Sequence, residues 1–190
     1  KTLATYGRAL NFLCDRRFTR EDVIIALGGG VVGDLAGFTA ATYQRGITYI
    51  QVPTTLLSMM DSSVGGKTAV DLDHGKNQAG CFHQPAMVLC DPALLSTLPE
   101  REYRCGCAEI IKTAMLFDAG FFRELRQTPV RGQLEHVLSV CVAAKRDVVQ
   151  SDEFDRGQRA LLNFGHTVGH AVEACRDFTI SHGEGVAIGM

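Results

Sequence analysis

Three histidines near the end of the chain have the residue type and spacing of a metal site. His166 and His170 are four positions apart, and His182 follows twelve residues later. Residues four apart are neighbours on a helix surface, so the first two imidazoles can face one ligand. A third histidine returning nearby can complete a divalent metal site, whereas packed or solvated histidines are the alternative. Thr167 and Val168 occupy the inner positions, so the glutamate base of the His-Glu-x-x-His proteases is missing.

The residues before the first histidine continue the same pattern. Arg159, Asn163, His166 and His170 follow one another in steps of four, three and four. On a continuous helix these steps align a guanidinium, an amide and two imidazoles on one stripe. The sequence therefore predicts one helix face that combines metal ligands with anion-binding groups.

The surroundings of this helix contain two further signals. Gly165 and Gly169 permit the close approach of a partner helix or ligand, despite a propensity cost of roughly 1 kcal/mol for each glycine. A metal site needs more ligands than two histidines, and carboxylates are suitable. The residues alone do not choose among Glu109, Glu173 and Glu184.

A glycine-rich turn is the main chemical signal in the first half. A buried strand is expected over residues 22–27, and it is followed by Gly28–Asp34 and an apolar helix that runs to about Thr42. The turn has the Gly-x-Gly-x-x-Gly spacing between strand and helix, where glycines let the backbone approach a pyrophosphate at a helix N-terminus. A plain tight turn is the alternative. No acid lies about 20 residues further on to bind a ribose hydroxyl.

Residues 61–80 form the polar centre of the first half. Lys67 and Lys76 stand among glycines and hydroxyl residues, where we expect sharp turns with free main-chain amides. Such a segment suits an anionic ligand. The Gly-Gly-Lys-Thr piece does not extend to a nucleoside-triphosphate loop, because the first glycine of that pattern would fall at Asp61.

Two charged positions lie on apolar helices of the second half. Glu109 and Lys112 are three residues apart within a mostly apolar segment, so we expect partial burial of a pair that needs a partner, a metal or a substrate. Lys145 lies on the buried stripe of a helix expected over residues 133–149. It either extends its amine to solvent or points into an anion-binding cavity.

The arrangement of elements predicts an α/β chain with two domains. Strands expected over residues 22–27, 47–52 and 86–90 alternate with helices, the first helix covering residues 3–15, whereas the sequence beyond Pro99 is helical almost throughout. We place the boundary near residues 95–98. This predicts a Rossmann-like nucleotide-binding domain over residues 1–96 and an all-α metal and substrate domain over residues 97–190.

Composition excludes several classes of protein. Nineteen basic and 21 acidic residues without long runs of one sign argue against a nucleic-acid partner, and no apolar run approaches a membrane span. We expect a cytoplasmic protein. The seven cysteines are odd in number and dispersed, which favours reduced, buried thiols. The absence of an initiating Met and the end of the chain within a helical pattern predict an internal fragment that lacks both ends.

Six motifs occur in order along nearly the whole chain. They are Gly28–Asp34, Val52–Thr55, Asp61–Thr68, Gly75–Asn77, Ala108–Lys112, and Asn163–His166 with His170 and His182–Glu184. Together they resemble the 3-dehydroquinate synthase family of sugar-phosphate cyclases. The resemblance implies conversion of 3-deoxy-D-arabino-heptulosonate 7-phosphate to 3-dehydroquinate and phosphate, in the shikimate pathway that leads to chorismate and the aromatic amino acids. It also implies NAD that is reduced and reoxidised in each turnover, and a zinc or cobalt ion.

The resemblance also implies roles for individual residues. The implied metal ligands are Glu109, His166 and His182. The implied NAD contacts are Gly29, Gly30, Val31, Val32, Gly33, Asp34, Thr54, Thr55, Lys67, Lys76, Leu94, Leu95, Ser96 and Thr97. The implied substrate-binding and catalytic residues are Arg45, Asp61, Lys67, Asn77, Lys112, Lys145, Arg159, Asn163 and His170.

The chain departs from the family pattern at two places, Cys105–Cys107 before the metal glutamate and Asp71–His74 before Gly75. Neither touches an implied role. The family is expected to form homodimers when full length. The competing hypotheses are another sugar-phosphate cyclase, such as an aminodehydroquinate or cyclitol synthase, a metal-dependent polyol dehydrogenase, and an inactive fragment.

Overall fold

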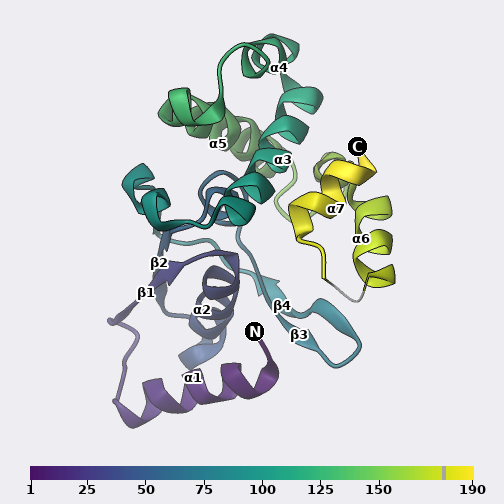
Figure 1. Ribbon diagram of the computed structural model, residues 1–190. Helices are drawn as coiled ribbons and strands as arrows, with labels where there is room; N and C mark the ends of the chain where they lie inside the picture. The colour runs from purple at the N-terminus through teal and green to yellow at the C-terminus, as the bar shows by residue number, and fades with distance from the viewer. Residues whose placement is uncertain (177–178) are drawn as a thin grey trace. The chain divides into compact units, whose positions relative to one another are not determined.

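The computed structural model describes residues 1–176 and 179–190, which form two compact units (Figure 1). The first unit comprises Lys1–Thr54 and Ser62–Asp91, and the second comprises Thr55–Asp61 and Pro92–Met190. The second unit thus begins shortly before the predicted boundary at residue 96 and includes a short segment from the first half of the chain. None of the helices in the described ranges has the length and apolar character of a membrane span.

The first unit contains a parallel sheet of the order β1-β2-β5. Strand β1 (Val23–Gly28) leads through α2 (Gly30–Thr42) and a short 3-10 turn, η1 (Tyr43–Arg45), into β2 (Thr48–Pro53), with Val23 opposite Thr48. Strand β5 (Met87–Val88) pairs with the other edge of β2, and α1 (Leu3–Asp15) precedes the sheet. A parallel pair requires such a crossover helix. The strand-turn-helix order predicted around the glycine turn is therefore confirmed.

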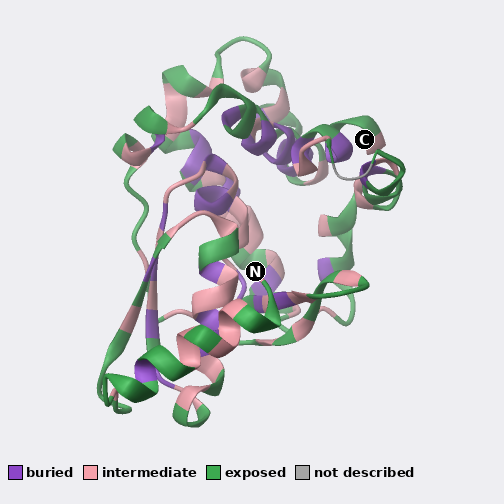
Figure 2. Cartoon of the chain, turned by 60° about the horizontal axis from the view of Figure 1, so that its bottom comes forward, coloured by how far each residue is buried: buried purple, intermediate pink, exposed green. Residues whose placement is uncertain are grey.

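The prediction that β1 is fully buried is wrong. Ala26 is buried, but Val23, Ile25 and Leu27 are 42%, 64% and 61% exposed. Successive strand residues point to opposite faces, and the described residues cover only the face to which Ala26 belongs. Met87 of β5 is half exposed too, so the strand expected over residues 86–90 is shorter and more open than predicted. Figure 2 shows this mixture of buried and exposed positions along the strands.

A hairpin occupies the segment that was expected to consist of polar turns. Strands β3 (Lys67–Leu72) and β4 (Gly75–Phe82) pair antiparallel, with a bulge between Val70 and Leu72. Thr68 and Val70 are buried, whereas Lys67 at the start of the strand is exposed. This period of two is typical of a strand with one face packed on a core. Glycines and charged residues obscure it in the sequence.

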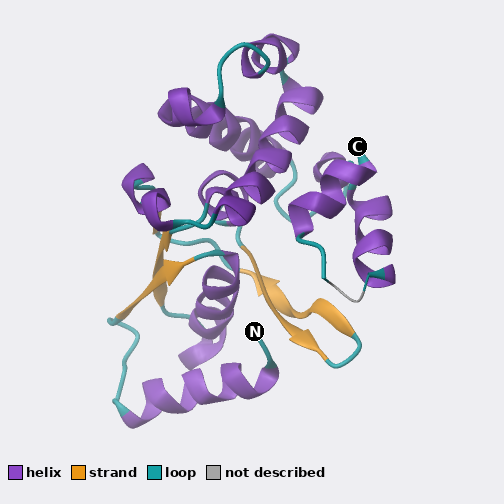
Figure 3. Ribbon diagram, viewed as in Figure 1, coloured by secondary structure: helices purple, strands orange, loops and turns teal. Residues whose placement is uncertain are grey.

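The second unit is helical (Figure 3). It includes most of the π-helical turn η2 (Ser58–Ser62), before which the Thr55 hydroxyl accepts a 3.1 Å hydrogen bond from the Ser58 amide. Its other elements are η3 (Pro92–Thr97), α3 (Glu100–Phe117), α4 (Ala119–Leu125), η4 (Val130–Gln133), α5 (Leu134–Ser151), η5 (Gln158–Asn163), α6 (His166–Cys175) and α7 (His182–Gly189). The helix expected over residues 133–149 is confirmed as α5.

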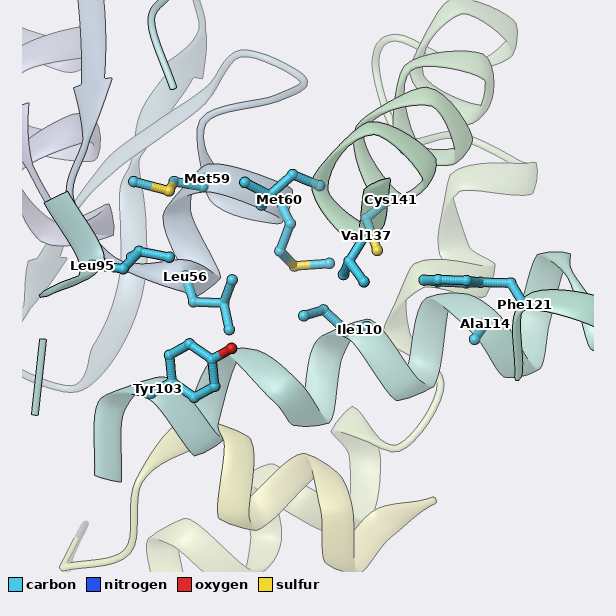
Figure 4. Packing of buried hydrophobic residues seen from close by; sticks show 11 residues of the cluster. Leu56, Met59, Met60, Leu95, Tyr103, Ile110, Ala114, Phe121, Val137 and Cys141 are labelled. Atoms are coloured by element: carbon cyan, nitrogen blue, oxygen red, sulfur yellow. The ribbon is translucent and has the colours of Figure 1, made fainter. Parts of the chain in front are cut away.

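Helix α3 lies at the centre of the second unit. One of its faces packs into an apolar core, in which Ile110 points toward Met60 and Val137 (Figure 4). Gly106 lets the chain come close on the same side, since a Cβ there would lie 2.7 Å from Leu56 side-chain atoms. The buried apolar side chains of α3 fix the helix in place. Residues of α3 that face away from the core are thereby held in fixed directions.

The seven cysteines are reduced, as predicted, but the prediction that they are buried holds for only some of them. Cys105 and Cys141 are buried, whereas Cys14, Cys90 and Cys175 are exposed. Exposure of these three follows from their positions on α1, after β5 and at the end of α6, where the helix or strand surface faces solvent.

Candidate metal centre

The structure brings the three histidines together. His166 and His170 lie one turn apart on α6, with ring centroids 5.3 Å apart. His182 opens α7, and its ring centroid lies 5.0 Å from that of His166 and 5.9 Å from that of His170. One nitrogen from each ring can be chosen so that all three lie within 4.8 Å of one another. The predicted convergence of a third histidine on the helical pair is confirmed.

Glycines hold α6 and α7 in backbone contact. A Cβ on Gly169 would lie 2.8 Å from the carbonyl carbon of Gly185, and a Cβ on Gly189 would lie 2.0 Å from the carbonyl oxygen of Gly165. Gly165 meets Gly189, and Gly169, four residues later, meets Gly185, four residues earlier. The two helices therefore pack antiparallel, as they do in Figure 1. Any side chain at these positions would separate them. The predicted close approach at Gly165 and Gly169 is confirmed.

The prediction that Arg159, Asn163, His166 and His170 share one continuous helix is wrong. Residues 158–163 form the 3-10 helix η5, and Gly165 then adopts φ 79°, a left-handed conformation that ends the run before α6 begins. Arg159 is buried, and its Nη1 donates to the Glu153 carbonyl oxygen at 2.6 Å. Asn163 is exposed. Regular spacing in the sequence concealed the break because glycine also occurs inside helices.

Glu109 of α3 is the carboxylate that meets the histidines. It is completely buried, and its Oε1 lies 3.5 Å from His182 Nε2 and 3.7 Å from His166 Nε2. Its Oε2 forms an ion pair with the buried Lys112, as their spacing predicted. Oε2 is thus paired with a cation, whereas Oε1, which faces the two imidazoles, accepts no hydrogen bond of good geometry from the described residues. Buried carboxylates are normally satisfied by donors or by metal ions, so this one is suited to a cation.

The structure separates the three glutamates that the sequence left open. Glu184 is exposed, accepts from the Ser181 amide at 2.6 Å and pairs with Arg101 at 2.8 Å. Glu173 is buried and lies 3.1 Å from Nδ1 of His182. Glu109 is thus the glutamate whose carboxylate lies near Nε2 of two histidines, Glu173 lies behind one ring, and Glu184 caps α7.

The pKa values of the two imidazoles shift in opposite directions. Burial lowers the pKa of His166, and the charge of Lys112 adds to this effect. The pKa of His182 is raised above its ordinary value, chiefly by the Glu109 carboxylate, against the effect of burial and with help from Glu173. The lowered pKa of His166 favours the neutral ring, which is the form that binds metal ions.

The predicted cations of the second unit have internal partners. Lys145 forms an ion pair with the Asp61 carboxylate and also donates to the Asp61 carbonyl oxygen. Burial alone would raise the pKa of Asp61, but the charges of Lys145 and Lys112 hold it at about 2. Lys112 donates to the Leu162 carbonyl oxygen at 2.7 Å. These amines are fixed in position close to the histidine-bearing elements of the same unit.

The glycine turn of the first unit has the local geometry of a nucleotide fingerprint. Gly29 is the N-cap of α2, and Gly28 has φ 158°. A Cβ on Gly33 would lie 2.6 Å from Oε1 of Gln51 on β2, so the glycine leaves room for this side chain where the helix packs on the strand. Asp34 forms an ion pair with Lys1. The turn leaves the amide groups at the start of α2 at the carboxyl end of β1.

The remaining predicted site residues are distributed over both units. Arg45 and Asn77 are exposed and have φ 69° and 58°. The backbone N–H of Asn77 donates to Asp71 Oδ1 at 2.8 Å. Leu95 packs into the core of the second unit as part of η3. The first unit carries Gly29, Gly30, Val31, Val32, Gly33, Asp34, Arg45, Thr54, Lys67, Lys76 and Asn77. The second unit carries Thr55, Asp61, Leu94, Leu95, Ser96, Thr97, Glu109, Lys112, Lys145, Arg159, Asn163, His166, His170 and His182.

Sequence reasoning missed the contact that docks α7 on α3. The Gly183 amide donates to Sγ of Cys105 at 2.9 Å, and a Cβ on Gly183 would lie 2.4 Å from the Cys105 backbone. Cys105 had been assigned no role. The glycine directly after His182 was the available signal, since a close backbone approach requires it.

Comparison with known proteins identifies relatives over the full length of the chain. The family described as 3-dehydroquinate synthase N-terminal matches residues 1–105, and the one described as 3-dehydroquinate synthase C-terminal matches residues 106–190. A 3-dehydroquinate synthase of Desulforamulus reducens is 51% identical over the whole chain, which covers 55% of that protein. The chain therefore spans about half the length of the curated relatives it matches.

Two solved structures have closely similar folds. A 2-deoxy-scyllo-inosose synthase complexed with carbaglucose-6-phosphate, NAD⁺ and Co²⁺ is 34% identical, with a TM-score of 0.91 over the whole chain and 54% of its own length. A 2-epi-5-epi-valiolone synthase from Streptomyces hygroscopicus subsp. jinggangensis, with NAD⁺ and Zn²⁺ bound, is 32% identical, with a TM-score of 0.93 over the whole chain and 55% of its own length.

Proposed function

The chain belongs to the 3-dehydroquinate synthase family, and from this premise we propose that the protein of which it is part converts 3-deoxy-D-arabino-heptulosonate 7-phosphate to 3-dehydroquinate and phosphate. In this reaction it acts as a phosphate-eliminating carbon–oxygen lyase of the shikimate pathway. The observation that carries the proposal is the completely buried Glu109 carboxylate, whose oxygen lies within 4 Å of two imidazole nitrogens.

Glu109, His166 and His182 are proposed to hold a divalent metal ion, zinc or cobalt. Two imidazoles and a carboxylate are ligands of a kind that zinc accepts in catalytic sites that keep a position open for substrate. The position of Glu109 Oε1, 3.7 Å from His166 Nε2 and 3.5 Å from His182 Nε2, supports this ligand set. When bound, the ion supplies Lewis-acid polarisation of a substrate oxygen, and NAD supplies reversible hydride acceptance.

NAD is proposed to bind the first unit at the glycine turn. The close packing of Gly33 against Gln51 and the N-cap at Gly29 support a pyrophosphate at the start of α2, where main-chain amides favour an anion. The proposed NAD contacts in the first unit are Gly29 to Asp34, Thr54, Lys67 and Lys76. By the family resemblance, Thr55 and Leu94 to Thr97 of the second unit are proposed to contact NAD as well. The two cyclases of similar fold have NAD⁺ bound, which supports NAD as the cofactor.

The polar residues of the second unit are proposed to bind and orient the sugar phosphate. Lys112 and Lys145 are held by Glu109 and Asp61, so their amines are positioned before a substrate arrives. Pre-positioned cations favour carboxylate and phosphate groups without the cost of ordering flexible side chains. His170 is exposed beside the proposed metal ligands and is proposed to face substrate. The proposed substrate residues of the second unit are Asp61, Lys112, Lys145, Arg159, Asn163 and His170. By the family resemblance, Arg45, Lys67 and Asn77 of the first unit are proposed to contact substrate as well.

Another sugar-phosphate cyclase is the nearest alternative, since such enzymes share the fold. The identity of 51% to a 3-dehydroquinate synthase, against 32–34% to the two other cyclases, favours the first assignment. We also propose a cytoplasmic enzyme that works as a homodimer, as expected of the family. A polyol dehydrogenase differs in outcome, because it would accumulate reduced cofactor.

The test is an assay of phosphate release from the heptulosonate phosphate by the protein that carries this chain. We expect release that stops on thorough chelation and returns with Zn²⁺ or Co²⁺, with no net accumulation of NADH. Net NADH formation would favour a dehydrogenase. Activity that persists after complete metal removal would refute the proposed role of the cation, and running the 190-residue chain alongside tests how much of the activity resides in it.

A further inference from the structure

We propose that Glu173 is a positioning residue that fixes the ring of His182 for metal binding. This inference rests on the proposed metal site, but it concerns a residue outside the proposed ligand set. Glu173 lies on α6 and His182 on α7, so the contact between them crosses the glycine-packed pair of helices.

The position of Glu173 follows from the spacing of that crossing. Gly165 and Gly169 meet α7 at successive steps of four residues, and Glu173 is the next step along α6. At Glu173 the helices are joined by a hydrogen bond between side chains and not by a backbone contact. Glu173 Oε1 lies 3.1 Å from His182 Nδ1. The two glycine steps bring the helices close enough for the short reach of this third contact.

The direction of the hydrogen bond matters for the metal. A carboxylate accepts, so the proton of the neutral His182 ring is placed on Nδ1 and the lone pair is left on Nε2. Nε2 is also the atom that lies 3.5 Å from Oε1 of Glu109. Glu173 therefore selects both the tautomer and the ring orientation that present the lone pair of His182 toward Glu109.

The burial of Glu173 indicates a specific role. Its side chain is 4% exposed, although removing a carboxylate from water is costly. Gly185 makes room for it, since a Cβ there would lie 3.1 Å from Glu173 Oε1. An apolar side chain would fill the same space at lower cost, whereas the carboxylate also accepts from the imidazole.

A matched control exists on the surface of the same unit. Glu124 also pairs with a histidine, His136, at 3.3 Å, but both side chains are about half exposed. Replacing Glu124 by Gln makes the same chemical change in a carboxylate–histidine pair that is not part of the proposed site. Glu173→Gln retains an acceptor oxygen for Nδ1, whereas Glu173→Ala removes it.

The experiment measures Co²⁺ affinity by competition with a chelator, together with the visible spectrum of the bound Co²⁺, in the protein that carries this chain. We expect Glu173→Ala to weaken binding by about 10- to 100-fold and to alter the spectrum, because partners behind metal-binding histidines contribute on this scale. Glu173→Gln should lose less, and Glu124→Gln should match the wild type. Circular dichroism checks the folding of each variant.

His166→Ala separates the possible failures. Wild-type Co²⁺ affinity and spectrum in Glu173→Ala, with loss of binding in His166→Ala, would overturn the inference and leave the metal site standing. Equal binding by wild type and His166→Ala would overturn both. If Glu173→Ala does not fold, Glu173→Leu decides, because it also removes the acceptor but fills the space: a weaker affinity with a changed spectrum supports the role, and values identical to the wild type refute it.

Discussion

Replacing Gly169 by Ala tests whether backbone contact between α6 and α7 sets the geometry of the histidines. The new Cβ would lie 2.8 Å from the Gly185 carbonyl carbon and 3.1 Å from the Val186 nitrogen. These are backbone atoms that cannot rotate away. Carbon atoms pack at about 3.5 Å or more, so the helices must separate by roughly 0.7 Å. Metal ligands tolerate displacements of only about 0.2 Å, and His182 moves with α7.

The expected magnitude is the balance of two effects. Forced overpacking costs about 1–3 kcal/mol, and the better helix propensity of Ala returns about 1 kcal/mol. We therefore expect a loss of up to about 2 kcal/mol in the free energy of unfolding. Co²⁺ affinity should fall about tenfold, which corresponds to ~1.4 kcal/mol.

Gly7→Ala on α1 is the control, because no heavy atom lies within 4 Å of a Cβ at that position. It should stabilise its helix by up to about 1 kcal/mol and leave metal affinity unchanged. Urea unfolding and Co²⁺ competition measure both variants. The reasoning fails if Gly169→Ala is as stable as Gly7→Ala and binds Co²⁺ like the wild type.

Two further predictions concern polar site residues of the second unit. Asp61→Asn removes the carboxylate that pairs with the mostly buried Lys145 and should cost about 3 kcal/mol of unfolding free energy near neutral pH. The pKa of Asp61 is depressed from 3.8 to about 2, so its contribution to the free energy of unfolding is present above pH 3.8. The difference between wild type and variant in urea unfolding should therefore shrink as the pH falls toward 2. A constant difference would contradict the pairing. His166→Ala should deplete bound metal, whereas His170→Ala should impair turnover and largely retain the metal, as measured by elemental analysis and phosphate release. Equal metal loss in both variants would indicate that His170 is a ligand.

Local patterns in the sequence were sufficient where a local property decides the structure. The spacing of His166 and His170 predicted a helical pair, and the glycine turn before α2 was placed correctly between strand and helix. Gly165 and Gly169 predicted a close helix neighbour. Each of these depends on residues a few positions apart, which a periodicity captures.

The failures have equally specific causes. The stripe from Arg159 to His170 breaks because Gly165 takes a left-handed φ, which its neighbours in sequence do not reveal. The partner of Lys145 is Asp61, 84 positions away, and no periodicity can identify it. The hairpin of β3 and β4 was missed because strand pairing depends on residues across the hairpin.

The distribution of the candidate ligands over α3, α6 and α7 has a consequence for stability. A cation held by Glu109, His166 and His182 would act as a cross-link between segments that are far apart in the chain, and it would bind the folded arrangement in preference to the unfolded chain. By linkage, free metal at 100 times its dissociation constant would add about 2.7 kcal/mol to the folded state. The thermal midpoint of the helical unit should then depend on metal concentration, so a melting curve becomes a titration of the site.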